Sequence, residues 1–450
     1  MKVAVIGTGY VGLTTGVCLA YVGHDVWCLD VDENKVAALN AGKIPIFEPQ
    51  LDELLDAAKR RLHFTSSYEE AIPSAEVVFI AVGTPSTANG QPDLRYLRSA
   101  SESLGKHMDS PFTVVVNKST VPIGSGNWVG ALIREAQKAA GKHAEYAVAS
   151  NPEFLREGSA IYDSLYPDRI VIGADSNKAL EVLYRLYRPV IDQSFPAPAF
   201  CPRREGFGAV PLVSTDLASA ELIKYAANAF LATKISFINE IGLLAGRVGA
   251  DIQHIARGMG LDSRIGNRFL NAGLGWGGSC FGKDTAALAA TAQEYGLGMS
   301  IVTAARNVNF AMREKVIDRL QDALKILKGR TVAVLGLAFK PNTDDLRDAP
   351  AVDIIRRLQD RGAIVHAHDP IAMERFQREF SDLSGTLCPS VDEAVAESDA
   401  IVLATEWTEY RDLDWKALAA NVRQKHVLDT RLSLDHSSLR AAGWNVIQLP

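Results

Sequence analysis

Cysteine is scarce in this chain of 450 residues, which contains only Cys18, Cys28, Cys201, Cys280 and Cys388. The number is odd, the positions are scattered, and no two of them form a Cys-X-X-Cys pair. This usage argues against a disulfide framework and against a structural zinc site. It favours a reducing compartment, and we expect no bound metal.

The chain also lacks an excess of positive charge. Lys and Arg number 47 against 53 Asp and Glu, which gives a formal net charge of −6 at pH 7. That balance argues against a nucleic-acid partner and against an acidic membrane surface. No uninterrupted apolar run approaches the ~20 residues that span a bilayer, and the N-terminal MKVAVIGTG does not have the layout of a signal peptide. We therefore expect a cytoplasmic protein without membrane attachment.

What the sequence does contain is an alternation of short apolar strands and helical segments. Residues 3–6, 25–29, 77–82 and 113–116 have the pattern of buried strands, and residues 13–21, 34–40 and 51–60 have a helical period. Such alternation predicts a parallel sheet with helices on both faces. The length allows about three domains.

The middle of the chain breaks this alternation. Residues 193–215 hold four prolines and two glycines, which predicts an irregular connection. A helix from the N-cap Asp216 to about Val248 follows, and a second helix covers about residues 301–327. After residue 329 the alternation restarts, and residues 331–335 and 399–405 resemble residues 3–6 and 76–82.

A glycine cluster, Gly7-Thr8-Gly9-Tyr10-Val11-Gly12, joins the first strand to the first helix. Glycines at this spacing allow a tight turn, a close approach of the backbone to a pyrophosphate, and close packing of the helix on the strand. Asp30 ends the next strand, where an acid binds a ribose 2′-hydroxyl and repels a 2′-phosphate. These residues predict NAD rather than NADP, while the alternative is a glycine turn that binds nothing.

The corresponding turn after residue 335 has one glycine and a lysine, Lys340. It predicts another ligand, or none, for the second α/β region.

The expected fold is α/β, with two Rossmann-like doubly wound parallel-sheet domains joined by a central helical segment that includes one long helix. The predicted boundaries are an NAD-binding domain at 1–212, a helical domain at 213–328 and a second Rossmann-like domain at 329–450.

A second glycine cluster, residues 275–284 (GWGGSCFGKD), contains Cys280. The helical pattern that follows places this cysteine just before a helix N-terminus, beside Lys283. Both features stabilise a thiolate, so they favour a nucleophile over the alternative of a small buried residue in a tight turn.

The sequence resembles the nucleotide-sugar 6-dehydrogenases, the UDP-glucose/GDP-mannose dehydrogenase family, over nearly its whole length. The matching segments occur in the family's order: GTGYVG (7–12), GTP (83–85), KSTVPIG (118–124), SNPEFLREG (150–158), ELIKYAANAFLATKISFINE (221–240), DSRIG (262–266), WGGSCFGKD (276–284) and LAFKPNTDDLRDAP (337–350). The resemblance is closest to the members that act on UDP-glucose. It implies two NAD-dependent oxidations of a sugar CH2OH to a carboxylate, through a thiohemiacetal and a thioester on a cysteine.

The resemblance also implies the residues of the site. The catalytic set is Cys280 as the nucleophile, Lys224 and Asn228 as oxyanion-stabilising groups, Asp284 and Thr120 as organisers of water and proton transfer, and Glu153 as a candidate base for thioester hydrolysis. The NAD set is Gly7, Gly9, Val11, Gly12, Asp30, Lys35, Thr84, Thr120, Glu157, Lys283 and Arg347. The UDP-glucose set is Glu153, Phe154, Leu155, Lys224, Asn228, Arg264, Phe269, Gly277, Cys280 and Lys340.

Two positions depart from the family pattern. Gly282 stands where proline is usual, and Phe269 stands where some members have tyrosine.

In several relatives the arginine that matches Arg264 comes from a neighbouring subunit, so we expect a homodimer or a higher homo-oligomer. The alternatives left open are the same chemistry on GDP-mannose or UDP-N-acetylmannosamine, a non-catalytic NAD-dependent binding protein, and a single-step hydroxyacid dehydrogenase that would not need Cys280.

Overall fold

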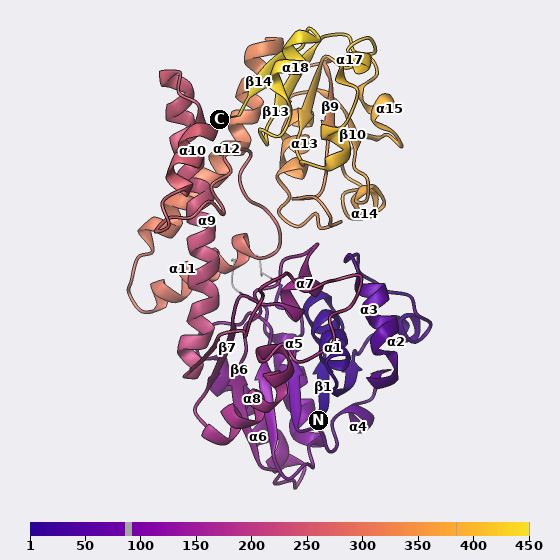
Figure 1. Ribbon diagram of the computed structural model, residues 1–450, viewed down its shortest axis with the longest axis vertical. Helices are drawn as coiled ribbons and strands as arrows, with labels where there is room; N and C mark the ends of the chain where they lie inside the picture. The colour runs from indigo at the N-terminus through magenta and orange to yellow at the C-terminus, as the bar shows by residue number, and fades with distance from the viewer. Residues whose placement is uncertain (86–91, 384, 450) are drawn as a thin grey trace. The chain divides into compact units, whose positions relative to one another are not determined.

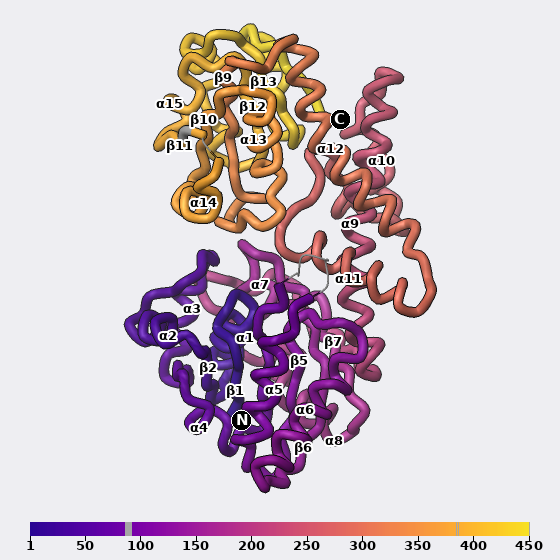
Figure 2. Tube along the Cα trace, turned by 180° about the vertical axis from the view of Figure 1, so that it is seen from behind, coloured from indigo at the N-terminus to yellow at the C-terminus, as the bar shows by residue number. Residues whose placement is uncertain are grey.

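The computed structural model describes residues 1–85, 92–383 and 385–449. The chain divides into two compact units, residues 1–226 and 227–450. Figures 1 and 2 draw each unit from opposite sides. The domain boundaries expected at residues 212 and 328 remain predictions.

The first unit is built on a sheet which, in the part of the chain that the structure describes, has eight strands in the order β3-β2-β1-β4-β5-β6-β7-β8. Neighbouring strands are parallel except for β6 and β7, which are antiparallel. The strands are β1 Lys2–Ile6, β2 Asp25–Leu29, β3 Leu62–Thr65, β4 Val77–Ile80, β5 Thr113–Asn117, β6 Tyr146–Ser150, β7 Ile170–Ala174 and β8 Leu212–Thr215.

Helices cover both faces of this sheet. Successive side chains of a strand point to opposite faces, so each strand contributes to two separate apolar cores. Val3 and Val5 of β1 belong to one apolar core with α1, α3, α7 and α8, while Ala4 and Ile6 belong to another with α4, α5 and α6. The helices are α1 Tyr10–Tyr21, α2 Glu33–Asn40, α3 Leu51–Ala58, α4 Tyr68–Ala71, α5 Arg95–His107, α6 Ser125–Ala139, α7 Ala160–Leu165 and α8 Asn177–Ile191, with a 3-10 turn η1 at Lys59–Arg61.

The long helix expected from Asp216 is present as α9, Leu217–Val248. The Asp216 carboxylate accepts a hydrogen bond of 2.8 Å from the N–H of Ser219, as an N-cap does. By length and composition alone α9 would suffice to cross a membrane, with a mean hydropathy of 1.3 over its most apolar window. It also carries Glu221, Lys224 and Asn228, all of them buried.

The second unit begins with α10 Ile252–Gly260, α11 Phe281–Glu294 and α12 Ser300–Leu324. Over the described residues its sheet has six parallel strands in the order β11-β10-β9-β12-β13-β14. These strands are β9 Thr331–Leu335, β10 Ile364–His368, β11 Thr386–Leu387, β12 Ala400–Leu403, β13 His426–Asp429 and β14 Asn445–Gln448. The remaining helices are α13 Pro350–Asp360, α14 Met373–Glu379, α15 Val391–Val395, α16 Thr408–Arg411, α17 Trp415–Leu418 and α18 His436–Ala441.

The two sheets repeat one topology. In each, the first strand of the sheet lies between the second and the fourth, and the order third-second-first-fourth-fifth-sixth is the Rossmann order. This confirms the expected fold of two Rossmann-like domains with a long central helix.

One expected segment is wrong in part. Residues 193–215 were expected to be irregular throughout, yet the last four form β8 at the edge of the first sheet. The prolines end at Pro211, so the N–H groups of the residues after it are free to pair with β7.

Candidate functional site

The first glycine cluster forms a tight turn between β1 and α1. Gly7 has φ +96°, and a Cβ atom there would lie 2.6 Å from the carbonyl oxygen of Ala81. A Cβ atom on Gly12 would lie 1.8 Å from the carbonyl oxygen of Gly7. Gly9 precedes α1 as its N-cap, and a Cβ atom there would meet nothing within 4 Å. The turn thus leaves open space at Gly9, beside Val11 in the first helical turn, where a pyrophosphate would fit.

Asp30 follows β2 and faces this turn. Its Oδ2 accepts hydrogen bonds from the N–H of Thr8 (2.8 Å), the hydroxyl of Thr8 (2.7 Å) and the ammonium of Lys35 (3.0 Å). Partial burial opposes ionisation, but these bonds and the N–H of Asp32 outweigh it and lower the pKa of Asp30. An ionised Asp30 suits a ribose hydroxyl, and Lys35 is its ion-pair partner.

Three further NAD candidates lie in the first unit. The hydroxyl of Thr84 donates to the carbonyl of Thr120 at 3.0 Å, so the structure brings these two residues together. Burial and the contact with Glu48 raise the pKa of the Tyr10 phenol, in the first turn of α1. The charge of Glu157 adds to this effect.

A buried ion pair forms the centre of the catalytic candidates in the first unit. The Lys224 ammonium lies 2.9 Å from the Glu153 carboxylate and donates to the carbonyl of Glu153 at 2.7 Å. Their side chains are 4% and 7% exposed. Burial would raise the pKa of Glu153, but Lys224, the N–H of Leu155 and the charge of Lys118 lower it instead.

Lys118 is a buried lysine that the sequence reasoning did not single out, although it opens the KSTVPIG segment. Its ammonium donates to Asn151 at 2.9 Å. Burial lowers its pKa to about 8, with the charge of Lys224 acting in the same direction and Glu153 against it. Two lysines therefore surround one buried carboxylate.

Phe154 and Leu155 extend from this centre. The Arg169 guanidinium lies 3.7 Å from the centroid of the Phe154 ring, and the Lys224 ammonium lies 5.5 Å from it. The N–H of Leu155 donates to Glu153 at 2.7 Å. The backbone of this loop thus helps to fix the carboxylate.

In the second unit, Cys280 is the N-cap residue of α11, as the sequence predicted. Its side chain is exposed, whereas the other four cysteines are buried. The hydroxyl of Ser279 lies 3.5 Å from its sulfur. A thiol at this position faces the positive end of a helix dipole, which stabilises a thiolate.

The glycines before Cys280 allow the loop to pack tightly within the second unit. A Cβ atom on Gly277 would lie 2.4 Å from the carbonyl oxygen of Asp348, and one on Gly278 would lie 2.8 Å from the Phe339 ring. The buried amide of Asn309, on α12, accepts from the N–H of Trp276 and donates to its carbonyl. The loop is therefore fixed at several points.

Asn228 and Asp284 are hydrogen-bonded to each other. The Asn228 amide donates to the Asp284 carboxylate at 2.6 Å, and Lys283 lies 3.8 Å from the same carboxylate. Lys224 and Asn228 are the two expected oxyanion-stabilising groups. In the structure each is held by its own carboxylate, Glu153 for Lys224 and Asp284 for Asn228.

The remaining candidates of the second unit differ in their surroundings. The Phe269 ring lies 6.3 Å from the Phe281 ring, next to Cys280, and the Lys340 ammonium lies 5.2 Å from the Phe339 ring. Arg347 is paired with Asp345 at 2.7 Å. Arg264 has a side chain that is 87% exposed and is paired with Asp262 at 2.6 Å.

The second sheet has its own aspartate at the position of Asp30. Asp369 follows β10, is fully buried, and accepts from the N–H groups of Leu337 and Ala338 and from the Trp407 indole through one oxygen. Its other oxygen accepts from the N–H groups of Ile371 and Ala372. Asp369 thus accepts five hydrogen bonds from groups of its own unit.

Two structural residues near the site were also missed. Glu48 accepts from the N–H groups of Gly158 (2.6 Å) and Ala160 (2.7 Å) and from the Tyr10 hydroxyl. Arg431 donates to the carbonyls of Gly275 and Phe339. Neither lies in a segment that the sequence analysis had singled out, and their partners are distant in sequence.

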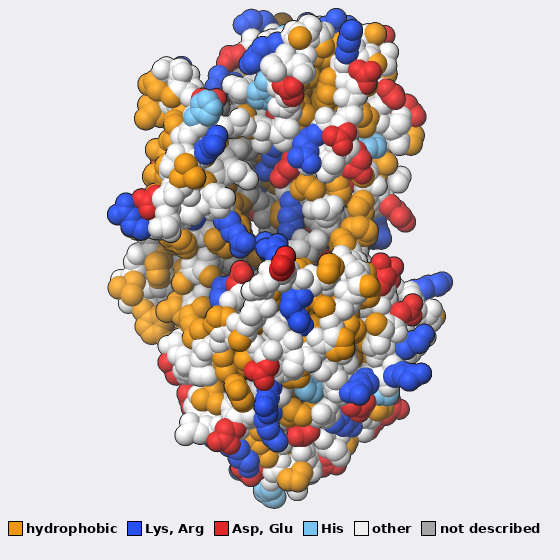
Figure 3. Space-filling view, viewed as in Figure 1, with side chains coloured by type: hydrophobic (Ala, Val, Ile, Leu, Met, Phe, Trp, Pro, Cys, Tyr) orange, Lys and Arg blue, Asp and Glu red, His pale blue; other side chains and the backbone are white. Residues whose placement is uncertain are grey.

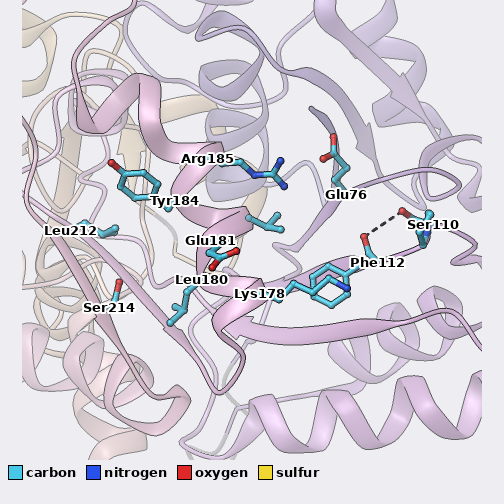
Figure 4. Close-up of a pocket in the computed structure, with 12 residues that line it drawn as sticks. Glu76, Ser110, Phe112, Lys178, Leu180, Glu181, Tyr184, Arg185, Leu212 and Ser214 are labelled. Atoms are coloured by element: carbon cyan, nitrogen blue, oxygen red, sulfur yellow. Dashed lines mark hydrogen bonds between the residues drawn. The ribbon is translucent and has the colours of Figure 1, made fainter.

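A groove of about 910 Å³ lies along α8 and β8 of the first unit (Figure 4). Lys178 lies over the Phe112 ring at 3.8 Å, and Tyr184 and Leu212 also line the groove. None of the candidate site residues lines this groove. It is separate from the candidate site.

The fold and the glycine turn define the class of an NAD-dependent, Rossmann-type oxidoreductase. Comparison with known families narrows this: residues 1–191 match the NAD binding domain, residues 218–311 the central domain and residues 333–436 the UDP binding domain of the UDP-glucose/GDP-mannose dehydrogenase family. The chain belongs to this family.

Individual relatives cover almost the whole chain. It is 48% identical to the UDP-glucose 6-dehydrogenase of Rhizobium meliloti (strain 1021), over 96% of this chain and 95% of that protein. It is 44% identical to UDP-glucose 6-dehydrogenase TuaD of Bacillus subtilis (strain 168), over 98% and 92%. A solved UDP-glucose dehydrogenase from Pyrobaculum islandicum is 40% identical, with a TM-score of 0.88 and coverage of 100% of this chain and 96% of that chain.

Proposed function

We propose that this protein oxidises UDP-glucose to UDP-glucuronate in two NAD-dependent steps at Cys280. The observation that carries the proposal is the placement of one exposed cysteine at the N-terminus of α11, with the other four cysteines buried. A single-step alcohol dehydrogenase has no use for such a thiol. The high identity to UDP-glucose 6-dehydrogenases supports UDP-glucose as the sugar nucleotide.

The cofactor fits the glycine turn. Gly7, Gly9, Gly12 and Asp30 would hold it, since the open space at Gly9 and the ionised Asp30 match a pyrophosphate and a ribose. When bound, NAD accepts one hydride in each oxidation, so two molecules are reduced per sugar. The proposed NAD contacts are completed by Val11, Lys35, Thr84, Thr120, Glu157, Lys283 and Arg347.

The chain's own groups act on the sugar. In the first oxidation, C6 of the alcohol loses a hydride and its hydroxyl proton passes to a water that Asp284 and Thr120 order, which leaves an aldehyde. The Cys280 thiolate adds to this carbon and forms a thiohemiacetal, whose oxyanion Lys224 and Asn228 stabilise. Each donor is held by a carboxylate of its own unit, Lys224 by Glu153 and Asn228 by Asp284.

Loss of the second hydride from the thiohemiacetal gives a thioester. Glu153, whose pKa is lowered by Lys224 against the effect of burial, is ionised and able to take a proton from the attacking water. Asp284 and Thr120 order that water. Its attack breaks the C–S bond, which releases the carboxylate and regenerates Cys280.

The proposed nucleotide contacts are Phe154, Leu155, Phe269, Gly277 and Lys340. Arg264, exposed in its own chain, is proposed to reach the site of a second copy. A stripe of exposed apolar side chains on α9 supports a homo-oligomer: Phe230, Phe237, Leu244 and Val248, each at least 45% exposed, repeat at helical spacing. Light scattering on the purified protein tests this.

The protein is further proposed to work in the cytoplasm without nucleic acid or membrane. Basic and acidic side chains are interspersed on the faces drawn in Figure 3, and the net charge is −6.

The deciding experiment measures NADH formed per UDP-glucose consumed, with the acid product identified by mass. We expect two NADH per sugar, and loss of acid formation in Cys280→Ser. One NADH per sugar would refute the covalent route. Turnover with GDP-mannose or UDP-N-acetylmannosamine but not with UDP-glucose would refute the choice of substrate.

A further inference from the structure

The first turn of α11 carries Cys280 and is anchored by a residue from another helix. Arg306, on α12, donates through Nη1 to the carbonyl oxygen of Gly282 at 2.7 Å and to the hydroxyl oxygen of Thr285 at 2.7 Å. The Thr285 hydroxyl in turn donates to the carbonyl of Phe281 at 2.6 Å. One guanidinium nitrogen thereby contacts Gly282 and Thr285 directly and Phe281 through the Thr285 hydroxyl, all in the first turns of the helix that starts next to the thiol.

The hydrogen bond from Arg306 reaches the first turn of α11 at a glycine, the residue type with the least restricted backbone. Gly282 has no side chain to restrict its backbone. A Cβ atom there would lie 3.0 Å from Oδ2 of Asp348. The hydrogen bond from Arg306 to its carbonyl therefore fixes a residue that sequence alone leaves flexible.

Arg306 also brings a positive charge to the turn. The charged groups with contacts around it are Lys283 and Asp284 on α11, Arg306 and Arg313 on α12, Asp348 in the loop before α13, and Asp353 on α13. These are three cations and three carboxylates, so without Arg306 the carboxylates would be in excess. A cation that offsets them favours a thiolate over a thiol.

We propose that Arg306 is a positioning residue for Cys280: it fixes the first turn of α11, which begins next to this cysteine, and it supplies a positive charge that favours the thiolate. The inference rests on the proposed nucleophilic role of Cys280. Its effect on the sulfur is nevertheless measurable without substrate or NAD.

The test is the rate of alkylation of Cys280 by iodoacetamide as a function of pH, in the full-length protein, with the modified site read by mass spectrometry. Because the other four cysteines are buried, Cys280 reacts first. In Arg306→Gln the midpoint of the rate profile should rise by about 0.5–1 pH unit. Arg319→Gln removes the same charge from an exposed position on α12 and should leave the midpoint unchanged.

Steady-state turnover provides the second readout. In Arg306→Gln, kcat with UDP-glucose should fall about threefold to tenfold at neutral pH and recover part of the loss at higher pH. An unshifted alkylation midpoint in Arg306→Gln overturns the inference. A shifted midpoint in a protein that needs no Cys280 for two-NADH turnover would instead refute the proposed function and leave the role of Arg306 in place.

Arg306→Lys decides the matter if the Gln variant does not fold. It keeps the charge but has a shorter side chain with no planar fork, so the midpoint should stay within about 0.2 units while kcat falls. A midpoint shift in this variant refutes the electrostatic role. An unchanged kcat refutes the anchoring role.

Discussion

The ion pair between Lys224 and Glu153 should cost far more to break than an ion pair of the same length at the surface. Lys178 and Glu145 provide the comparison, because both N···O distances are 2.9 Å. The side chains of the first pair are 4% and 7% exposed, and those of the second are 53% and 63% exposed. Burial is thus the property that separates them.

Lys224→Met leaves an ionised carboxylate buried without its partner, which costs about 3–5 kcal/mol in proteins generally. Lys118 still attracts Glu153 in this variant, so we expect a value at the lower end, about 3 kcal/mol. Lys178→Met removes an exposed pair and should cost about 0–1 kcal/mol. Urea unfolding at pH 7, followed by circular dichroism, measures both free energies.

The loss should also depend on pH in a defined direction. The folded-state pKa of Glu153 is lowered, so the stability it contributes is present above the unfolded value of about 4.3 and is lost as the pH falls through the folded pKa. In Lys224→Met the carboxyl takes up a proton at higher pH than in the wild type. The difference between the two proteins should therefore shrink from pH 7 to pH 4.

Equal losses in Lys224→Met and Lys178→Met would refute this reasoning, as would a loss that does not change with pH. The double variant Lys224→Met/Glu153→Gln provides the internal check. Because it removes both charges, it should recover most of the stability lost in the single variant.

Other residues give further predictions. Asp30→Ala should weaken NAD binding about tenfold or more, measured by calorimetry, while Asp369→Ala should lower the melting temperature and leave NAD affinity unchanged. Burial lowers the pKa of Lys118 to about 8, so its unfavourable effect on folding is full below pH 8 and is relieved as the pH rises toward about 10.4. The stability of the wild type relative to Lys118→Met should rise over that interval by about 2–3 kcal/mol. Glu48→Gln leaves a buried N–H without its acceptor and should destabilise by about 1–3 kcal/mol in urea unfolding.

Local patterns in the sequence were sufficient to predict the elements that carry the candidate site. The glycine turn, α9 with its cap at Asp216, and the placement of Cys280 before α11 all follow from spacing that acts over a few residues. The topology followed because strands that alternate with helices have few ways to form a sheet. The edge strand β8 was missed because it is short, follows a proline, and is defined by its pairing with β7 rather than by a local pattern.

The hydrogen-bond partners of the catalytic candidates could not be predicted in this way. Lys224 is held by a residue 71 positions away and Asn228 by one 56 positions away. No periodicity or local spacing relates residues at such separations, because the fold alone brings them together. The same applies to Arg306, whose importance depends on α12 lying beside the first turn of α11.

Comparison of the two Rossmann-type sheets distinguishes a glycine that the fold requires from a glycine that a ligand requires. Gly7 and Gly336 both follow the first strand of their sheet, have φ near +96°, and would clash if they carried a Cβ atom. Two residues later the first lobe has Gly9 and the second has Ala338, so the fold itself tolerates a side chain there. Since a Cβ atom on Gly9 would meet nothing in the protein, Gly9→Ala should leave the unfolding free energy within about 1 kcal/mol of the wild type yet weaken NAD binding, because the methyl group occupies the space for the pyrophosphate. Gly7→Ala should instead destabilise the protein strongly. Unchanged NAD affinity in a folded Gly9→Ala protein would show that the backbone at this turn does not approach the cofactor.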